Sequence, residues 1–266
     1  MKTTQSLFVC MLCMLLTTTL VGCRKGTGRT LTSATGSVYE CLVVMNDVPL
    51  TQEQLNEVAK LSLVNMASGY AKQIATTYDL VDAVMAADMP CMPQVEPYFR
   101  ITNVSMSHFD DMFKPTRNIL FVDINPQKYT QLKTKVSRDY WSKPQAVCRI
   151  QSPSQEDFVA YWLAHGEEIR EWFVGQEIQR QTKFYRASTN KDARALMQKQ
   201  GYDMLIPEDY IVLMDTVLAG ATTYSLRQPI ILEDEVRVLW CCNNKGSMRR
   251  DIIVYSYPYT DVNTFT

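Results

Sequence analysis

The chain has 266 residues, and its 27 Lys and Arg against 28 Asp and Glu give a formal net charge of −1 at pH 7. This near-balance excludes the strong basic excess that is typical of nucleic-acid-binding proteins, so no nucleic-acid partner is expected. Hydrophobic residues make up 46% of the sequence, which is enough for a globular core. Length and composition together predict one large domain or two small ones.

The N-terminal segment has the pattern of an export signal. Its first six residues are polar with one positive charge, and an apolar run from Leu7 to Leu16 follows. That run is shorter than the ~20 apolar residues that cross a bilayer. The segment ends in Leu20-Val21-Gly22-Cys23, which resembles the bacterial lipobox, where the cysteine thiol takes a diacylglycerol group before cleavage. We expect residues 1–22 to be a lipoprotein signal peptide; a plain signal peptide cut elsewhere and an uncleaved anchor helix are the alternatives.

The residues after Cys23 predict where the protein is held. Residues 23–37 are rich in Ser, Thr and Gly, which predicts a flexible tether. No aspartate follows Cys23, and aspartate at that position usually retains a lipoprotein at the inner membrane. We therefore expect a cell-envelope protein bound to the lipid bilayer through acylated Cys23, in the outer membrane and facing the periplasm. Besides the lipid bilayer, the expected partner is another protein of the cell envelope.

Hydrophobic periodicity and turn residues predict the elements of the folded part, residues 38–266. Strands are expected at Val38–Met45, Asn118–Ile124, Pro144–Ile150, Asp203–Ile206 and Tyr210–Met214. Helices are expected at Thr51–Ala67, at Tyr70–Ala87, more weakly at Tyr129–Tyr140, from Pro153 onward, and at Asn190–Gln200. The order strand, helix, strand, strand, helix, strand matches a ferredoxin-like plan. The expected fold class is α+β: an antiparallel sheet with helices packed on one face, a ferredoxin-like βαββαβ core and a C-terminal β-hairpin formed by Val236–Cys242 and Asp251–Tyr257.

The helix that begins at Pro153 has two distinct faces. Its apolar stripe predicts burial of Phe158, Tyr161, Trp162, Ile169, Trp172, Phe173 and Ile178. Its charged residues predict a solvent face, with Glu167–Arg170 and Glu177–Arg180 as local pairs. Gly166 and Gly175 weaken the helix and allow a kink.

Five cysteines follow Cys23, and four of them lie in apolar, strand-like runs. Cys41, Cys148, Cys241 and Cys242 are expected to be buried free thiols. A disulfide in an oxidising compartment is the alternative.

The sequence contains no recognised catalytic or metal-binding motif, so no metal and no cofactor are expected. Its two histidines are His108 and His165. Glu168 has the spacing to share a metal with His165, but a solvated helical face explains that pair more simply. Tyr255, Tyr257 and Tyr259 alternate along one strand, and packing explains them better than sugar or peptide binding.

Several segments together resemble an uncharacterised bacterial lipoprotein family, domain of unknown function 4837. The segments are Pro93–Phe99, Thr116–Leu120, Trp141–Gln145, Ile206–Tyr210 and Tyr255–Tyr259. The resemblance covers roughly residues 38–262, implies lipoprotein status and supplies no catalytic residue. Members of that family continue beyond the position of Thr266, so a short variant or a C-terminally truncated chain is expected.

Glu96, Arg117 and Asn118 are the candidate ligand-binding residues. Arginine beside asparagine at the start of a strand can bind a carboxylate or phosphate. The favoured alternative is that Arg117 pairs with Glu96 and pins the proline-rich loop. We therefore expect a non-enzymatic binding or structural module. The alternative is a periplasmic, hydrolase-like enzyme with a site around Glu96, Arg117 and His108.

Overall fold

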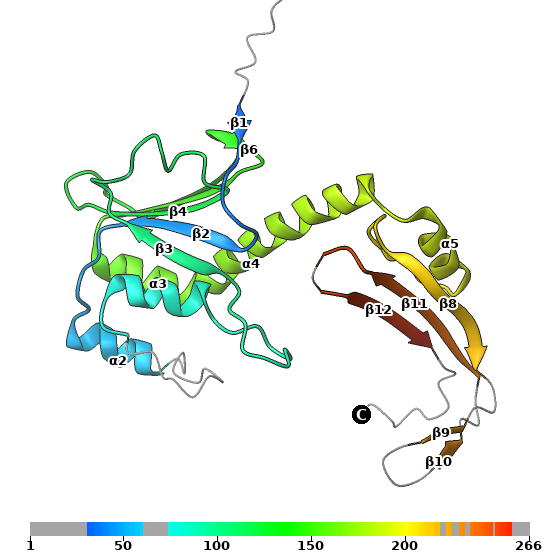
Figure 1. Ribbon diagram of the computed structural model, residues 1–266. Coiled ribbons are helices and arrows are strands. Elements are labelled where there is room, and N and C mark those ends of the chain that lie inside the picture. The colour runs from blue at the N-terminus through cyan, green and yellow to red at the C-terminus, as the bar shows by residue number, and fades with distance from the viewer. Residues whose placement is uncertain are drawn as a thin grey trace, which may run out of the picture.

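The computed structural model describes residues 31–60, 74–218, 222–224, 229–231, 235–246 and 248–256. The predicted signal peptide, Cys23 and most of the predicted tether lie outside these residues, as do Tyr257 and Tyr259. A five-stranded sheet carries helices on one face, and the long helix α4 runs from that sheet to a second, smaller sheet (Figure 1).

The main sheet is mostly parallel. Its strands are β2 (Glu40–Met45), β3 (Arg100–Val104), β4 (Asn118–Ile124), β5 (Lys133–Arg138) and β7 (Ala146–Ser152), in the order β3-β2-β4-β7-β5. Three strand pairs are parallel, and only the β5–β7 pair is antiparallel. The expected antiparallel, ferredoxin-like core is therefore not the one that forms. The physical reason is that β2 and β4 are buried on both faces, and such continuous apolar strands belong in parallel sheets covered on both sides.

Two short strands complete this part of the structure, and a strand forms where a helix was expected. Within the segment predicted as tether, Thr32–Ser33 form β1, which pairs in parallel with β6 (Ser142–Lys143). The helix expected at Tyr129–Tyr140 is wrong, because strand β5 occupies the middle of this segment. Side chains of β5 alternate between the two faces, and its backbone is paired with β7 from Lys133↔Gln151 to Arg138↔Ala146.

Three helices cover one face of this sheet (Figure 1). They are α2 (Gln52–Lys60), α3 (Thr77–Met85) and α4 (Gln155–Ala187). The expected capping box of α2 is confirmed, since the Gln54 backbone N–H donates to Thr51 Oγ1 at 3.3 Å and the Thr51 N–H donates to Gln54 Oε1 at 2.9 Å. The last residues of the first predicted helix, 61–67, lie outside the described residues.

Helix α4 differs from its prediction in two ways. It starts two residues later than Pro153 implied, because Ser154 is the N-cap and accepts a hydrogen bond from the Asp157 backbone N–H. It is also a single helix of 33 residues that runs through Gly166 and Gly175. An alanine Cβ at position 166 would lie 3.0 Å from the Trp162 ring, so glycine there leaves room for that ring.

The core lies on both faces of the five-stranded sheet. On the helix face, Phe158, Trp162, Ile169 and Phe173 of the predicted stripe pack with Leu80, whereas Ile178 of that stripe is exposed. On the other face, loops cover the sheet with aromatic side chains: Phe109, Phe113 and Trp141 pack against Ile119 and Phe121. Both faces are thus closed.

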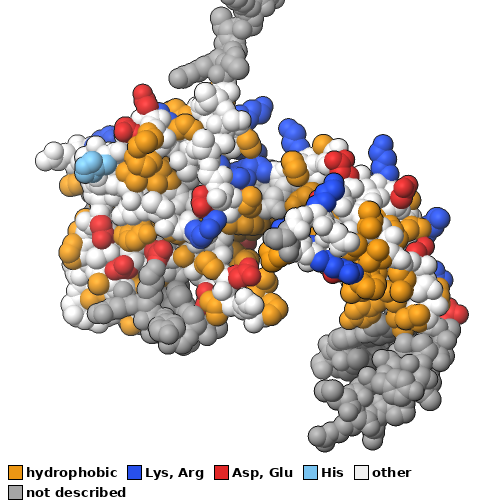
Figure 2. Space-filling model, in the orientation of Figure 1, with side chains coloured by type: hydrophobic (Ala, Val, Ile, Leu, Met, Phe, Trp, Pro, Cys, Tyr) orange, Lys and Arg blue, Asp and Glu red, His pale blue; other side chains and the backbone are white. Residues whose placement is uncertain are grey.

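The smaller sheet is antiparallel and packs on α5 (Lys191–Lys199). Its order is β12 (Arg250–Ser256), β11 (Val236–Asn243), β8 (Ile211–Leu218), and a separate two-stranded ladder joins β9 (Thr222–Tyr224) to β10 (Pro229–Ile231). The C-terminal hairpin is confirmed. The strand expected at residues 203–206 does not form, and the adjacent Pro207 makes only an isolated bridge with Thr189. Hydrophobic side chains gather on this part of the molecule (Figure 2), and those of Ile211, Ile253 and Tyr255 are exposed.

No helix in the described part of the chain is both long and apolar enough to cross a membrane. All five cysteines in that part are free thiols, and the four predicted to be buried are buried. Burial raises the pKa of the Cys148 thiol to about 12 and raises that of Cys41, which nearby Cys148 raises further.

These environments predict a pattern of thiol reactivity. In the native protein at neutral pH, N-ethylmaleimide should modify exposed Cys91 and leave Cys41 and Cys148 unmodified, because the thiolate is the reactive form and both are buried as thiols. Peptide mapping by mass spectrometry measures this, with protein in denaturant as the control in which all three react. Modification of native Cys148 at the rate of Cys91 would contradict this packing.

Candidate functional site

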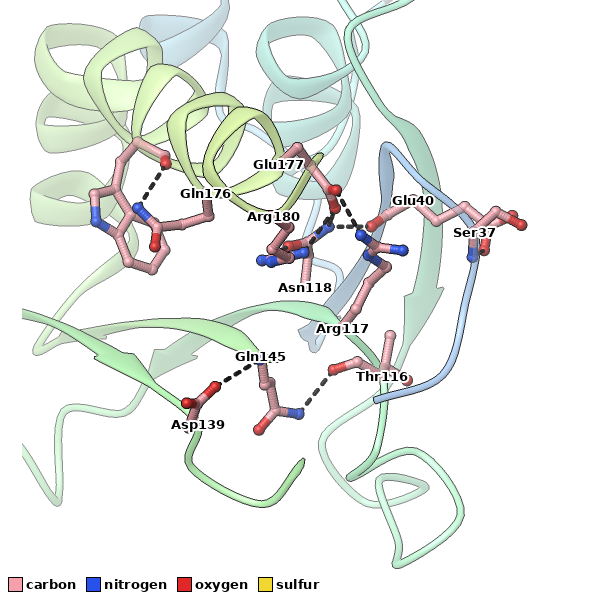
Figure 3. Close-up of polar contacts among 11 residues, drawn as sticks. Ser37, Glu40, Thr116, Arg117, Asn118, Asp139, Gln145, Gln176, Glu177 and Arg180 are labelled. Carbon is pink, nitrogen blue, oxygen red and sulfur yellow. Dashed lines mark hydrogen bonds and ion pairs between the residues drawn. The ribbon is translucent and has the colours of Figure 1, made fainter. Parts of the chain in front are cut away.

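A carboxylate with no exposed surface lies at the centre of a polar network between α4 and the start of β4 (Figure 3). Three side chains donate to Glu177. Arg117 Nη2 lies 2.7 Å from Glu177 Oε2, Asn118 Nδ2 lies 2.7 Å from Oε1, and Arg180 Nη1 lies 2.8 Å from Oε1. Both carboxylate oxygens are therefore engaged by charged or amide donors, which is the usual condition for burying a charge.

Asn118 joins three elements through its amide. It is the first residue of β4, and its Nδ2 also donates to the Glu40 backbone carbonyl of β2 at 2.8 Å. Its Oδ1 accepts from Arg180 Nη2 at 2.8 Å. Because Glu177 and Arg180 are three residues apart, they lie on one face of α4. The Asn118 amide therefore connects helix α4 to strands β2 and β4.

The network holds two guanidinium groups against one buried carboxylate. Side-chain exposure is 18% for Arg117, 11% for Arg180 and 0% for Glu177. Burial lowers the pKa of Arg180, and the charge of Glu177 opposes this. Burial raises the pKa of the neighbouring Tyr39 phenol, and the Glu177 charge raises it further.

Glu40 supplies a second negative charge at the edge of the network. Its pKa is lowered mainly by the Ser37 backbone N–H, which donates to Oε2 at 2.7 Å, and also by the charges of Arg100 and Arg117. Glu40 therefore partly balances the positive charge that Arg117 and Arg180 carry in excess of the one negative charge of Glu177.

Gln145 holds the loop that precedes β4. Its Nε2 donates to the backbone carbonyls of Lys114 at 2.6 Å and Thr116 at 2.7 Å, and its backbone N–H donates to Asp139 Oδ1 at 3.0 Å (Figure 3). Arg117 follows directly after this loop. Its Nε is buried and has no acceptor among the residues that the structure describes. The arrangement therefore fixes Arg117 in place, with its Nη2 already bound to Glu177.

The structure brings Arg117 and Asn118 together but leaves Glu96 apart. The expected Arg117–Glu96 pair is wrong: the partner is Glu177, and the described contact of Glu96 is its backbone carbonyl, which accepts from the Met89 N–H at 2.8 Å. His108 shares no hydrogen bond or ion pair with Arg117, and its Nδ1 lies 2.6 Å from Ser105 Oγ on the surface. Glu96, Arg117 and His108 do not form one network.

Glu177 and Arg180 were assigned by sequence to the solvent face of α4, and this was wrong. They do form the expected local pair, but inside the protein. The signal was present in the helical register, since Glu177 lies four residues after the buried Phe173 and so continues the apolar stripe. Arg170 is buried too, and its guanidinium carbon lies 4.3 Å from the Tyr98 ring centroid.

Within the described ranges, no group of three or more His, Cys, Asp or Glu side chains is placed to hold a metal ion. His165 and Glu168 form a surface pair, with Nδ1 3.0 Å from Oε2.

A protein-family model matches part of the chain. The family model described as domain of unknown function (DUF8532) matches residues 60–186. This range contains all four side chains of the Glu177 network. The finding is consistent with an uncharacterised family, but the model that matches is not domain of unknown function 4837. No curated protein and no solved structure matches the chain.

Proposed function

We propose that this chain is a lipid-anchored protein of the bacterial cell envelope, in the outer membrane and facing the periplasm, whose folded part is a non-catalytic binding or structural module. The observation that carries the proposal is the sequence Leu20-Val21-Gly22-Cys23 at the end of a short apolar run. The thiol of Cys23 would carry diacylglycerol, and its amine, exposed by cleavage, a further acyl chain. Two or more chains anchor a protein stably, whereas one binds only marginally. Similarity to domain of unknown function 4837 is part of this proposal.

The geometry of the Glu177 network supports a structural role for the candidate residues. Arg117, Asn118 and Arg180 donate to Glu177 or to each other, so their strongest donors are already used inside the protein. Such a network holds α4 against the sheet and presents a rigid surface. Turnover of ester, peptide or glycan substrates by the purified protein, abolished by a single substitution, would contradict the non-catalytic role.

The anchor is tested by metabolic labelling with radioactive palmitate in a bacterium that has an outer membrane. The wild-type protein should incorporate label, and Cys23→Ser should not, because the acyl acceptor is gone. Cys91→Ser is the matched control: it removes an exposed thiol of the folded part and should be labelled like the wild type. Equal labelling of Cys23→Ser and wild type would overturn the proposal.

A further inference from the structure

Four cations gather on the loop-covered face of the five-stranded sheet, opposite the helices. Arg149 of β7 is directly opposite Lys135 of β5, and Lys133 lies one row along, opposite Gln151. Lys128 comes from the loop after β4. Opposite residues in adjacent strands point to the same face, and like charges placed there repel. The Lys135–Arg149 pair therefore costs stability in the isolated protein.

Edge protection explains only part of this cluster. β5 is an edge strand, and lysines on an edge discourage pairing with other chains. That accounts for Lys133 and Lys135. It does not account for Arg149, which is on an interior strand, half-buried between β4 and β5.

Arg149 is held by aromatic rings, and no acidic side chain in the described part of the chain forms an ion pair with it. Its guanidinium carbon lies 4.6 Å from the ring centroid of Phe121, 5.0 Å from that of Tyr140 and 5.1 Å from that of Trp141. Ring faces attract the cation but accept none of its in-plane hydrogen bonds in the way a carboxylate does. Within the described ranges, no carboxylate forms an ion pair with Arg149, Lys133 or Lys135.

A cavity of about 130 Å³ opens beside Arg149, lined also by Lys128, Asp123, Tyr129 and Gln151. Asp123 is already satisfied, because its Oδ2 accepts from Lys128 Nζ at 2.8 Å and from the Tyr129 hydroxyl at 2.5 Å. Gln151 Nε2 donates to that hydroxyl at 3.1 Å. The cavity thus has its one carboxylate engaged, and the Arg149 guanidinium makes no hydrogen bond with any residue that the structure describes.

The position of this cavity suits a ligand site. Asp123 and Gln151 are the last residues but one of the parallel strands β4 and β7. Ligands of open sheets with parallel strands bind at the carboxyl ends of those strands. The hydrogen bond to Asp123 raises the pKa of Lys128, so this amine stays charged at neutral pH. Arg149 and Lys128 line the cavity with one carboxylate, and Lys135 and Lys133 stand opposite its lining residues Arg149 and Gln151. This excess of positive charge favours a ligand group with two negative charges over one with a single charge.

We propose that Arg149 and Lys128 at the cavity, with Lys135 and Lys133 beside them on β5, bind a phosphate group, either free inorganic phosphate or the phosphate of a lipid headgroup. The proposal goes beyond membrane anchoring and does not depend on acylation of Cys23. The guanidinium supplies paired N–H donors to two phosphate oxygens, and the lysines supply charge around them.

The test is calorimetric titration of the full-length protein in neutral detergent, at fixed ionic strength. The probes are inorganic phosphate, dihexanoyl phosphatidic acid and dihexanoyl phosphatidylcholine. We expect saturable binding of one of the first two, which distinguishes a free phosphate from a headgroup. Arg149→Gln should weaken it by about tenfold or more. Arg100→Gln is the matched control, an exposed arginine on the opposite edge strand of the same sheet that is paired with Glu40.

Lys135→Gln keeps the test informative if Arg149→Gln does not fold, because Lys135 is exposed. Removing the like-charge pair should raise Tm by about 1–2 °C while weakening phosphate binding severalfold. A purely protective role for this lysine would leave binding unchanged. Absence of binding by the wild type to both phosphate probes, or binding that neither substitution weakens, would overturn the proposal.

Discussion

Glu177→Ala should lower the free energy of unfolding by about 3–5 kcal/mol, one of the two largest single-site losses expected in this protein. The substitution leaves Arg117 and Arg180, both largely buried, without the carboxylate that holds them. The Asn118 amide loses one of its two acceptors at the same time. Removing one partner of a buried charged group is costly because the other charge stays desolvated.

Urea denaturation followed by circular dichroism measures this loss. Glu177→Gln should cost less, because it keeps the volume and one acceptor oxygen. Glu168→Ala is the control on the same helix: its side chain is 76% exposed and paired only at the surface, so no measurable change is expected. A loss below about 1 kcal/mol for Glu177→Ala would show that the network does not hold α4 to the sheet.

Trp162→Ala should cost about 3–5 kcal/mol as well, by a different mechanism. Trp162 is fully buried between α3 and α4, and its indole N–H donates to the Leu80 backbone carbonyl at 3.2 Å. It also stacks with Phe158 at 6.1 Å between ring centroids. Alanine would leave a large apolar cavity where the helices meet the sheet.

The matched control is Phe184→Ala, an aromatic residue on the same helix whose side chain is 67% exposed. It should change stability by no more than about 0.5 kcal/mol. Trp162→Phe should fall between the two, because the ring is partly replaced while the indole N–H is lost. Equal effects of the two alanine substitutions would mean that α4 does not pack as described.

Local features of the fold could be read from sequence, but strand pairing could not. The apolar run in β2 and the cap at Thr51 depend only on neighbouring residues, and both predictions are confirmed. Whether β2 pairs in parallel with β4 depends on residues more than 70 positions away. The continuous apolar run of β2 indicates a strand that is buried on both faces, which is typical of parallel sheets. The predicted order of strands and helices favoured an antiparallel sheet instead.

The candidate site shows the same division. Arg117 and Asn118 could be chosen because they adjoin each other at the start of a strand. The partner of Arg117 could not be predicted, because Glu177 lies 60 positions along the chain from Arg117. The prediction paired Arg117 with Glu96, which is nearer in the sequence. The helical register of Phe173 would have placed Glu177 on the buried face. The placement of Lys135 opposite Arg149 depends on the β5–β7 register, which a helix at Tyr129–Tyr140 would not allow.

Membrane attachment through one cysteine is the central claim, and the mass of the mature N-terminal peptide tests it most directly. The protein should be extracted from envelope membranes, digested and analysed by mass spectrometry. We expect a peptide that starts at Cys23 and carries diacylglycerol on sulfur with a further acyl group on its amine. An unmodified Cys23, in a longer peptide or in a chain cut elsewhere, would contradict the account.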